Sequence, residues 1–135
     1  MRHLAAIALF IVGAFVHLPP LIGVLGVPRL EALYGIDVAG PELEILMRHR
    51  AVLFGLLGGY QLFAVWRPAH RTVALVAGLV SLAAFLGLAW SVGGYGSTLA
   101  RVVLIDIVAI VVCVVGLIAH FSAGRDPAKG AVGGP

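Results

Sequence analysis

The side chains of this sequence that could do chemistry are few, and four of them lie close together in one apolar stretch. Glu44, Arg48, His49 and Arg50 are ionisable, and Glu44 precedes Arg48 by four positions, the favourable order for an ion pair on a helix. Successive residues of a helix are about 100° apart, so Arg48, His49 and Arg50 cannot all face the same side. We therefore expect this part of the chain to be enclosed by protein or to lie at the level of lipid headgroups.

Matching groups occur in two other apolar stretches. Arg101 lies near the start of the last stretch, and Asp106 follows about 7.5 Å deeper along a helix. A buried acid needs a partner, and Arg48 or Arg50 is the candidate. His17 lies just before a double proline, at a similar depth. The sequence thus predicts one polar cluster of ligand-binding residues: His17, Glu44, Arg48, His49, Arg50, Arg101 and Asp106.

Three kinds of chemistry are compatible with this cluster. Its arginines outnumber its acids, and guanidinium groups bind carboxylates and phosphates, which favours an anionic small molecule or a lipid headgroup as ligand. The same ion pairs could instead serve only to fix helix packing. Catalysis would need Glu44 or Asp106 as base and His49 as acid, although no spacing demands it. No acid lies three or four positions from His49 and no spacing indicates haem, so no metal and no cofactor are predicted.

The elements that must position these residues are membrane-spanning helices. Hydrophobic residues make up 61% of the 135 positions and charged residues only 11%, against about 25% charged in soluble domains. Four apolar stretches, at about 4–26, 43–66, 73–92 and 99–121, each approach the roughly 20 residues that a spanning helix needs. We predict an all-α, integral membrane four-helix bundle forming one domain over residues 1–121, followed by a disordered cytoplasmic tail at 122–135. Residues 1–16 resemble a signal peptide, but no small-residue cleavage site follows, so we expect a retained helix.

The positive charges of the short loops predict the orientation. Arg2, Arg67, Arg71 and Arg125 fall on one side of the four stretches, which is the cytoplasmic side by the positive-inside rule. The protein is therefore expected in the bacterial inner membrane with both termini in the cytoplasm and the polar cluster toward the outside. The arginines form no basic face, so no nucleic-acid partner is predicted.

Two segments carry a family resemblance. Residues 29–36, Arg-Leu-Glu-Ala-Leu-Tyr-Gly-Ile, and residues 46–55, with Arg48-His49-Arg50 at their centre, resemble a family of small bacterial four-helix membrane proteins without an established activity. Residues 91–95, Arg101 and Asp106 carry the same likeness, and the architecture is more distantly similar to that of DoxX-like proteins. Members of the closer family are often labelled phosphopantetheine adenylyltransferase. Such an enzyme is a soluble α/β protein with a glycine-rich phosphate loop, which this chain lacks, so the resemblance implies the fold and the Arg-His-Arg segment and not that activity.

Three functions remain open from the sequence. The first is a small membrane protein whose outward cluster binds an anionic or lipid-like molecule. The second is a non-catalytic accessory subunit or assembly factor of a larger membrane complex, and the third is a membrane enzyme acting on a lipid or quinone. The partners expected are membrane lipids, an anionic small molecule or lipid headgroup, and a protein partner or a second copy of the chain.

Overall fold

The computed structural model describes residues 2–124, and every regular element in that range is helical, as the all-α prediction requires. Met1 and residues 125–135 lie outside the described residues, and with them most of the expected tail. Ser122–Gly124, which we assigned to that tail, belong to the last helix. The elements are α1 (Arg2–Val12), the π-helix η1 (Gly13–His17), the 3-10 helix η2 (Pro19–Leu25), α2 (Val27–Tyr34), α3 (Pro41–Trp66), the 3-10 helix η3 (Pro68–His70), α4 (Arg71–Val92) and α5 (Ser97–Gly124).

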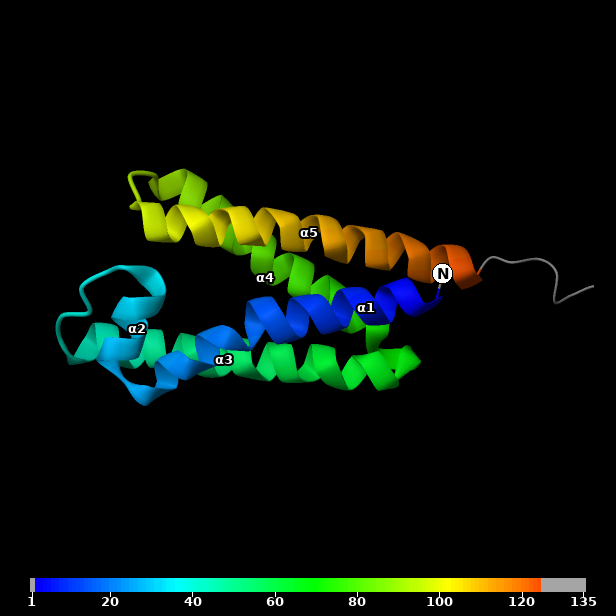
Figure 1. The fold of residues 1–135 in the computed structure, drawn as a ribbon, viewed down its shortest axis with the longest axis horizontal. Helices are drawn as coiled ribbons and strands as arrows, with labels where there is room; N and C mark the ends of the chain where they lie inside the picture. The colour runs from blue at the N-terminus through cyan, green and yellow to red at the C-terminus, as the bar shows by residue number, and fades with distance from the viewer. Residues whose placement is uncertain (1, 125–135) are drawn as a thin grey trace, which may run out of the picture.

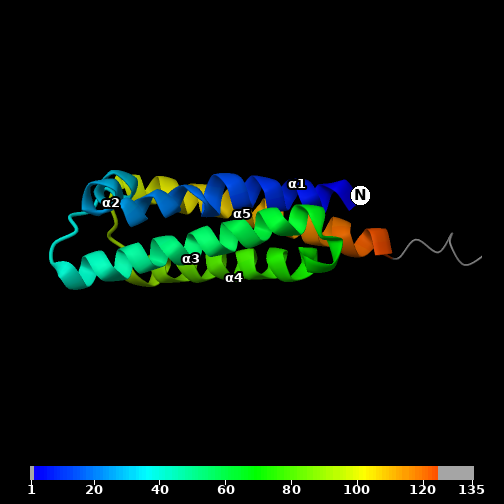
Figure 2. The ribbon, with the colours of Figure 1, turned by 90° about the horizontal axis from the view of Figure 1, so that it is seen from below.

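The long helices run lengthwise beside one another (Figures 1 and 2). α1 packs on α3 and α5, and α4 packs on the same two helices. The start of α1, the α3–α4 connection and the end of α5 lie at one end of the molecule, which we call the terminal end. α2, the start of α3 and the α4–α5 connection lie at the other, which we call the α2 end.

Three helical segments are long and apolar enough to cross a membrane: His3–Leu25, Pro68–Val92 and Ser97–Ser122. The fourth expected stretch, residues 43–66, lies within α3, which has 26 residues but is not among the three. The ionisable residues of its first turns, together with Tyr60 and Gln61 farther along, make α3 more polar than the others.

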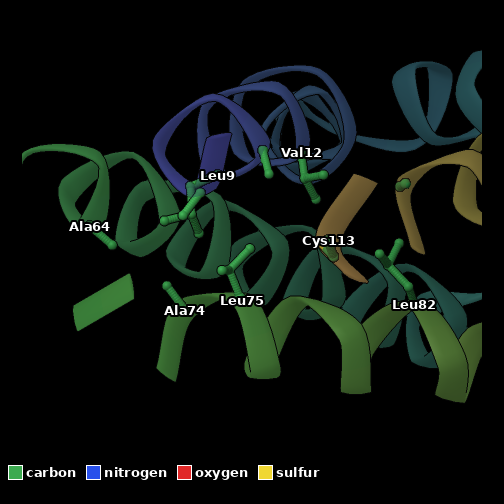
Figure 3. Packing of buried hydrophobic residues seen from close by; sticks show 10 residues of the cluster. Leu9, Val12, Ala64, Ala74, Leu75, Leu82 and Cys113 are labelled. Atoms are coloured by element: carbon green, nitrogen blue, oxygen red, sulfur yellow. The ribbon is translucent and has the colours of Figure 1, made fainter. Parts of the chain in front are cut away.

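The main core lies where α1, α3, α4 and α5 meet, and small residues allow the helices to approach closely. Leu9, Leu75, Leu82 and Cys113 are almost fully buried there. Figure 3 shows side chains of α1, α4 and α5 converging on this core. The other members are mostly small: Ala5, Ala8, Val12, Ala64, Ala74 and Ala109.

A smaller core closes the α2 end. Leu30, Tyr34 and Val38 are buried, and Leu33 and Leu99 pack against them. α2 ends at Gly35, whose φ of 64° is left-handed and whose N–H caps the helix. This short helix places Tyr34 inside the molecule.

The first stretch is not one regular helix. Its α-helical part ends at Val12, and the N–H of Leu18 donates to the carbonyl of Gly13 at 2.9 Å, which is the i→i−5 bond of a π-turn. Pro19 and Pro20 have no N–H to continue an α-helix, so a 3-10 helix follows. The π-turn contacts α3 closely, because a Cβ on Gly13 would lie 3.1 Å from the carbonyl oxygen of Gly58.

Candidate functional site

Arg50 of α3 is enclosed by three aromatic rings, one from each of three helices. Its guanidinium carbon lies 5.0 Å from the ring centre of Tyr34 in α2, 5.0 Å from that of Phe54 in α3, and 5.5 Å from that of Phe85 in α4. Aromatic faces attract cations at these distances. We call these three rings the aromatic cage.

Asp106 of α5 is a buried acid. It is 7% exposed, and Arg50 is the charge that acts on it. Both charges also act on Tyr34: burial raises the pKa of Tyr34 above its usual 10.0, Arg50 opposes this shift, and Asp106 adds to it. Within residues 2–124, however, Arg50 and Asp106 form no direct ion pair, and no hydrogen bond of either side chain is recorded. Neither side chain therefore satisfies the polar atoms of the other by direct contact.

A cavity of about 640 Å³ opens beside Arg50, between α3 and α4. Among the described residues that line it, Arg50 is the one charged side chain, and Ser81 and Tyr95 add hydroxyl groups. Aliphatic and aromatic side chains form the remaining wall: Leu53, Phe54, Leu57, Ala84, Phe85, Leu88, Ala89, Val92 and Leu99, with Gly93 at the turn. A mostly apolar cavity with one fixed charge is typical of a site for an amphiphilic ligand.

His17 lies behind the cage, fully buried in the π-turn. Its Nδ1 is 2.8 Å from Oε1 of Gln61, and its ring stacks on Phe54 at a centroid distance of 5.7 Å. Gln61 in turn donates from Nε2 to the carbonyl oxygen of Ala74 at 3.4 Å. That bond turns the amide oxygen toward His17, so Nδ1 of His17 carries the proton. Nε2 of His17 is therefore a buried acceptor, and it has no partner among the described residues.

The other residues of the predicted cluster lie apart from Arg50. Arg48 forms an ion pair with Glu44 at 3.0 Å on the surface of α3. His49 and Arg101 are exposed, and the structure records no ion pair or hydrogen bond for either within residues 2–124. His49 thus contacts neither Glu44 nor Asp106 as an acid–base pair would require. The seven residues do not form one cluster: Arg50, Asp106 and His17 lie around the cage, and the other four are at the surface.

Neither the aromatic cage nor the pairing of His17 with Gln61 was predicted from the sequence. Phe54 follows Arg50 by four positions, so it lies on the same side of the helix, and this spacing was a usable signal. Gln61 is a polar residue in an apolar helix, which often indicates an interhelical hydrogen bond. Tyr34 and Phe85 belong to other helices, and no spacing in the sequence links them to Arg50.

At the terminal end, Arg71 stabilises the end of α3. Its Nη2 donates to the carbonyl oxygen of Val65 at 2.7 Å, and its Nε donates to that of Ala64 at 3.4 Å. The last carbonyls of a helix lack i→i+4 partners, and the carbonyl oxygen of Ala64 also accepts from the N–H of Arg67 at 3.2 Å. Nearby, His70 lies 3.1 Å from the hydroxyl of Tyr60, with both side chains facing the surface.

Comparison with known proteins gives no relative: no protein-family model, no curated protein and no solved structure matches this chain. The family resemblance drawn from residues 29–36 and 46–55 therefore stays a prediction.

Proposed function

We propose that this chain is an integral membrane four-helix bundle that binds an anionic amphiphile in the cavity beside Arg50. The first, third and fourth spans are the three apolar segments found in the structure. α3 is the second span, because it runs lengthwise beside them and is as long as they are (Figure 1). Its ionisable first turns would lie near the headgroup region or face protein.

The terminal end faces the cytoplasm in this proposal. Arg67 and Arg71 lie between α3 and α4 at that end, where a positive-inside orientation needs them. Both termini are then cytoplasmic and the α2 end faces outward, in the inner membrane of a bacterium. The predicted likeness to small bacterial four-helix membrane proteins is consistent with this topology.

The observation that supports binding most directly is that aromatic rings surround the Arg50 guanidinium while its N–H donors have no hydrogen-bond partner among the described residues. Placing an arginine within a membrane costs about 2.5–3.5 kcal/mol on insertion scales. Each ring of the aromatic cage contributes about 0.5–2 kcal/mol as a cation–π contact, so three rings together offset a cost of that size. The face of an aromatic ring is not a conventional hydrogen-bond acceptor, however, and a guanidinium has five N–H donors. The cage therefore holds the charge in place and leaves its donors for an anion.

The walls of the cavity suit the apolar part of such a ligand. Leu53, Leu88 and Val92 line it and are 51%, 65% and 82% exposed, so the cavity opens where the protein surface is apolar. A ligand can enter from the lipid phase with its chain against these residues and its head at Arg50. A second groove of about 470 Å³, between the first span and α5, is lined by apolar side chains. It has no cation in its lining, so it serves as an internal control for binding at Arg50.

The test is photolabelling with a diazirine derivative of hexadecanoate, using the protein in phosphatidylcholine nanodiscs. Labelled positions are read by peptide mass spectrometry. We expect labels around Leu53 and Leu88 in the wild type. Arg50→Gln should lower them about tenfold, because a hydrogen bond to a charged group is worth about 1.5–3 kcal/mol. Labels in the second groove should stay unchanged, which controls for protein amount and lipid exposure.

A matched pair of variants covers the case in which Arg50→Gln fails to fold. Ala84 lines the cavity and the adjacent Ala83 does not, and both are exposed on α4. Ala84→Phe should fill the cavity and remove its labels, and Ala83→Phe should retain them. Equal labelling in these two variants would refute the proposal. If in addition a protein co-purified from native membranes in stoichiometric amount, the accessory-subunit alternative would be favoured.

A further inference from the structure

Ser81 places a hydroxyl group deep in the cavity beside Arg50. It lines the cavity from α4, halfway along the 22 residues of that helix. Tyr95, which also contributes a hydroxyl group to the lining, is 39% exposed and lies in the α4–α5 connection at the α2 end. The cavity therefore extends from the α2 end to the middle of the span that α4 forms in the proposed topology.

The hydroxyl group of Ser81 has no hydrogen-bond partner within residues 2–124. A serine in a helix commonly donates to a carbonyl of the preceding turn, as Ser91 of α4 does to that of Leu88 at 2.9 Å. Ser81 makes no such bond, and the middle of a membrane span supplies neither water nor lipid headgroups as partners. A polar group left unpaired in apolar surroundings is unfavourable, so this hydroxyl is suited to a polar atom of a ligand.

Ser81 lies about one helical turn from the aromatic cage. Phe85 follows Ser81 by four positions, about 6 Å along α4 and on nearly the same face of the helix. The ring centre of Phe85 is 5.5 Å from the guanidinium carbon of Arg50. Arg50 and Ser81 line the same cavity, with Ser81 on the side of Phe85 that faces the terminal end. A ligand anion bound at Arg50 therefore has Ser81 within reach of atoms a few bonds from that anion.

Resting on the proposed function, we infer that Ser81 is a specificity-determining residue and that the ligand is a single-chain carboxylate amphiphile with a second hydrogen-bonding group close to its carboxylate, such as a 3-hydroxy fatty acid. The carboxylate accepts two parallel N–H bonds from the Arg50 guanidinium, whose donors the aromatic cage leaves free. A hydroxyl group near the carboxylate can donate to Ser81 or accept from it. An unsubstituted acyl chain leaves Ser81 unpaired, and a site that bonds a ligand hydroxyl discriminates against the analogue without it.

The experiment measures competition against the hexadecanoate photolabel at the cavity positions, in phosphatidylcholine nanodiscs. The competitors are hexadecanoate, 3-hydroxyhexadecanoate and 16-hydroxyhexadecanoate, whose hydroxyl group is at the far end of the chain. The affinity of 3-hydroxyhexadecanoate relative to hexadecanoate should fall about fivefold from the wild type to Ser81→Ala, the size expected for one neutral hydrogen bond. Partitioning of each competitor into the nanodisc is the same for every variant, and partial loss of folded protein affects all competitors equally, so neither changes this comparison.

Ser91→Ala is the matched control. Ser91 does not line the cavity and its hydroxyl group already has a partner in α4, so its loss should leave the relative affinity unchanged. Ser81→Thr keeps a hydroxyl group and should retain the wild-type value. A relative affinity that Ser81→Ala does not change, or an equal change for 16-hydroxyhexadecanoate, would overturn the role of Ser81 while the binding site stands. Absence of specific cavity labelling in the wild type would overturn the proposed function, and this inference with it.

Discussion

Nδ1 of His17 donates a hydrogen bond of 2.8 Å to Oε1 of Gln61, which joins the π-turn of the first span to the middle of α3. Both side chains are fully buried, and Gln61 continues the connection to the backbone of α4 through Ala74. One polar contact thus links three helices inside an otherwise apolar core. The imidazole also stacks on Phe54, so the same contact supports one ring of the aromatic cage.

Gln61→Leu is expected to destabilise the protein by about 1–3 kcal/mol, because it leaves a second buried nitrogen of His17 without a partner. The double variant His17→Phe/Gln61→Leu replaces both polar groups by apolar ones and should recover most of that loss. Thermal unfolding in detergent, followed by circular dichroism, measures both. Additive losses in the double variant would show that the two side chains are not energetically coupled.

Gly78→Ala should disturb the same contact from the side of α4. A Cβ at this position would overlap Nε2 of Gln61, and Gln61 is too enclosed to move freely. We expect a loss of about 1–3 kcal/mol from overpacking. Gly59→Ala is the matched control, since a Cβ there would meet no atom within 4 Å. Alanine is a better helix former than glycine, so Gly59→Ala should be neutral or slightly stabilising, and equal losses at both positions would contradict the packing described here.

Arg71→Ala should lower the stability of the α3–α4 connection by about 1–2 kcal/mol, because it removes a cation and its donors from the carbonyl end of α3. Arg71→Lys keeps the charge but not the planar guanidinium that donates to two carbonyl oxygens at once. It should therefore recover part of the stability lost in Arg71→Ala. Hydrogen exchange of the last turn of α3 is the local measurement. Unchanged exchange there in Arg71→Ala would rule out the capping role.

Tyr34 should make the folded state sensitive to alkaline pH. Burial raises the pKa of Tyr34 above 10.0, so the folded state keeps this proton at pH values where the unfolded state loses it. The free energy of unfolding is then unaffected below about pH 10 and falls as the pH rises above it. Tyr34→Phe removes this contribution, so its unfolding temperature should decline less steeply between about pH 9 and 11. Parallel curves for the wild type and the variant would argue against an ionisable Tyr34 in the cage.

The helices could be predicted from the sequence because length, apolarity and the positions of Pro and Gly act locally. The predicted stretch 73–92 lies within α4 (Arg71–Val92), and the predicted stretch 99–121 lies within α5 (Ser97–Gly124). The relative rotation of the helices was not predictable, because it depends on side chains from several helices at once. Of the two arginines considered for Asp106, Arg50 acts on it through its charge without a direct ion pair, and Arg48 pairs with Glu44 instead.

α3, the proposed second span, is less apolar than the three helical segments that are apolar enough to cross a membrane. Two of the residues that lower its hydropathy, Arg50 and Gln61, belong to the site or support it, and the others, such as Glu44, Arg48 and His49, lie in the first turns of the helix. A helix that carries the polar groups of a membrane site is less apolar for that reason. The proposal that α3 is a span is therefore supported by its length and its position beside the other long helices.

The π-turn at Gly13–His17 determines which residue of the first span reaches the interior. In an uninterrupted α-helix at about 100° per residue, Val16 would stand in line with Leu9 and Val12, and His17 would point elsewhere. The extra residue in the turn shifts the phase, so that His17 takes the inner row and Val16 borders the apolar groove facing α5. Deleting a single residue from this turn would therefore allow a regular α-helix with the imidazole still at the centre of the protein, because His17 would become the sixteenth residue, whereas straightening the turn without a deletion would place the isopropyl group of Val16 there.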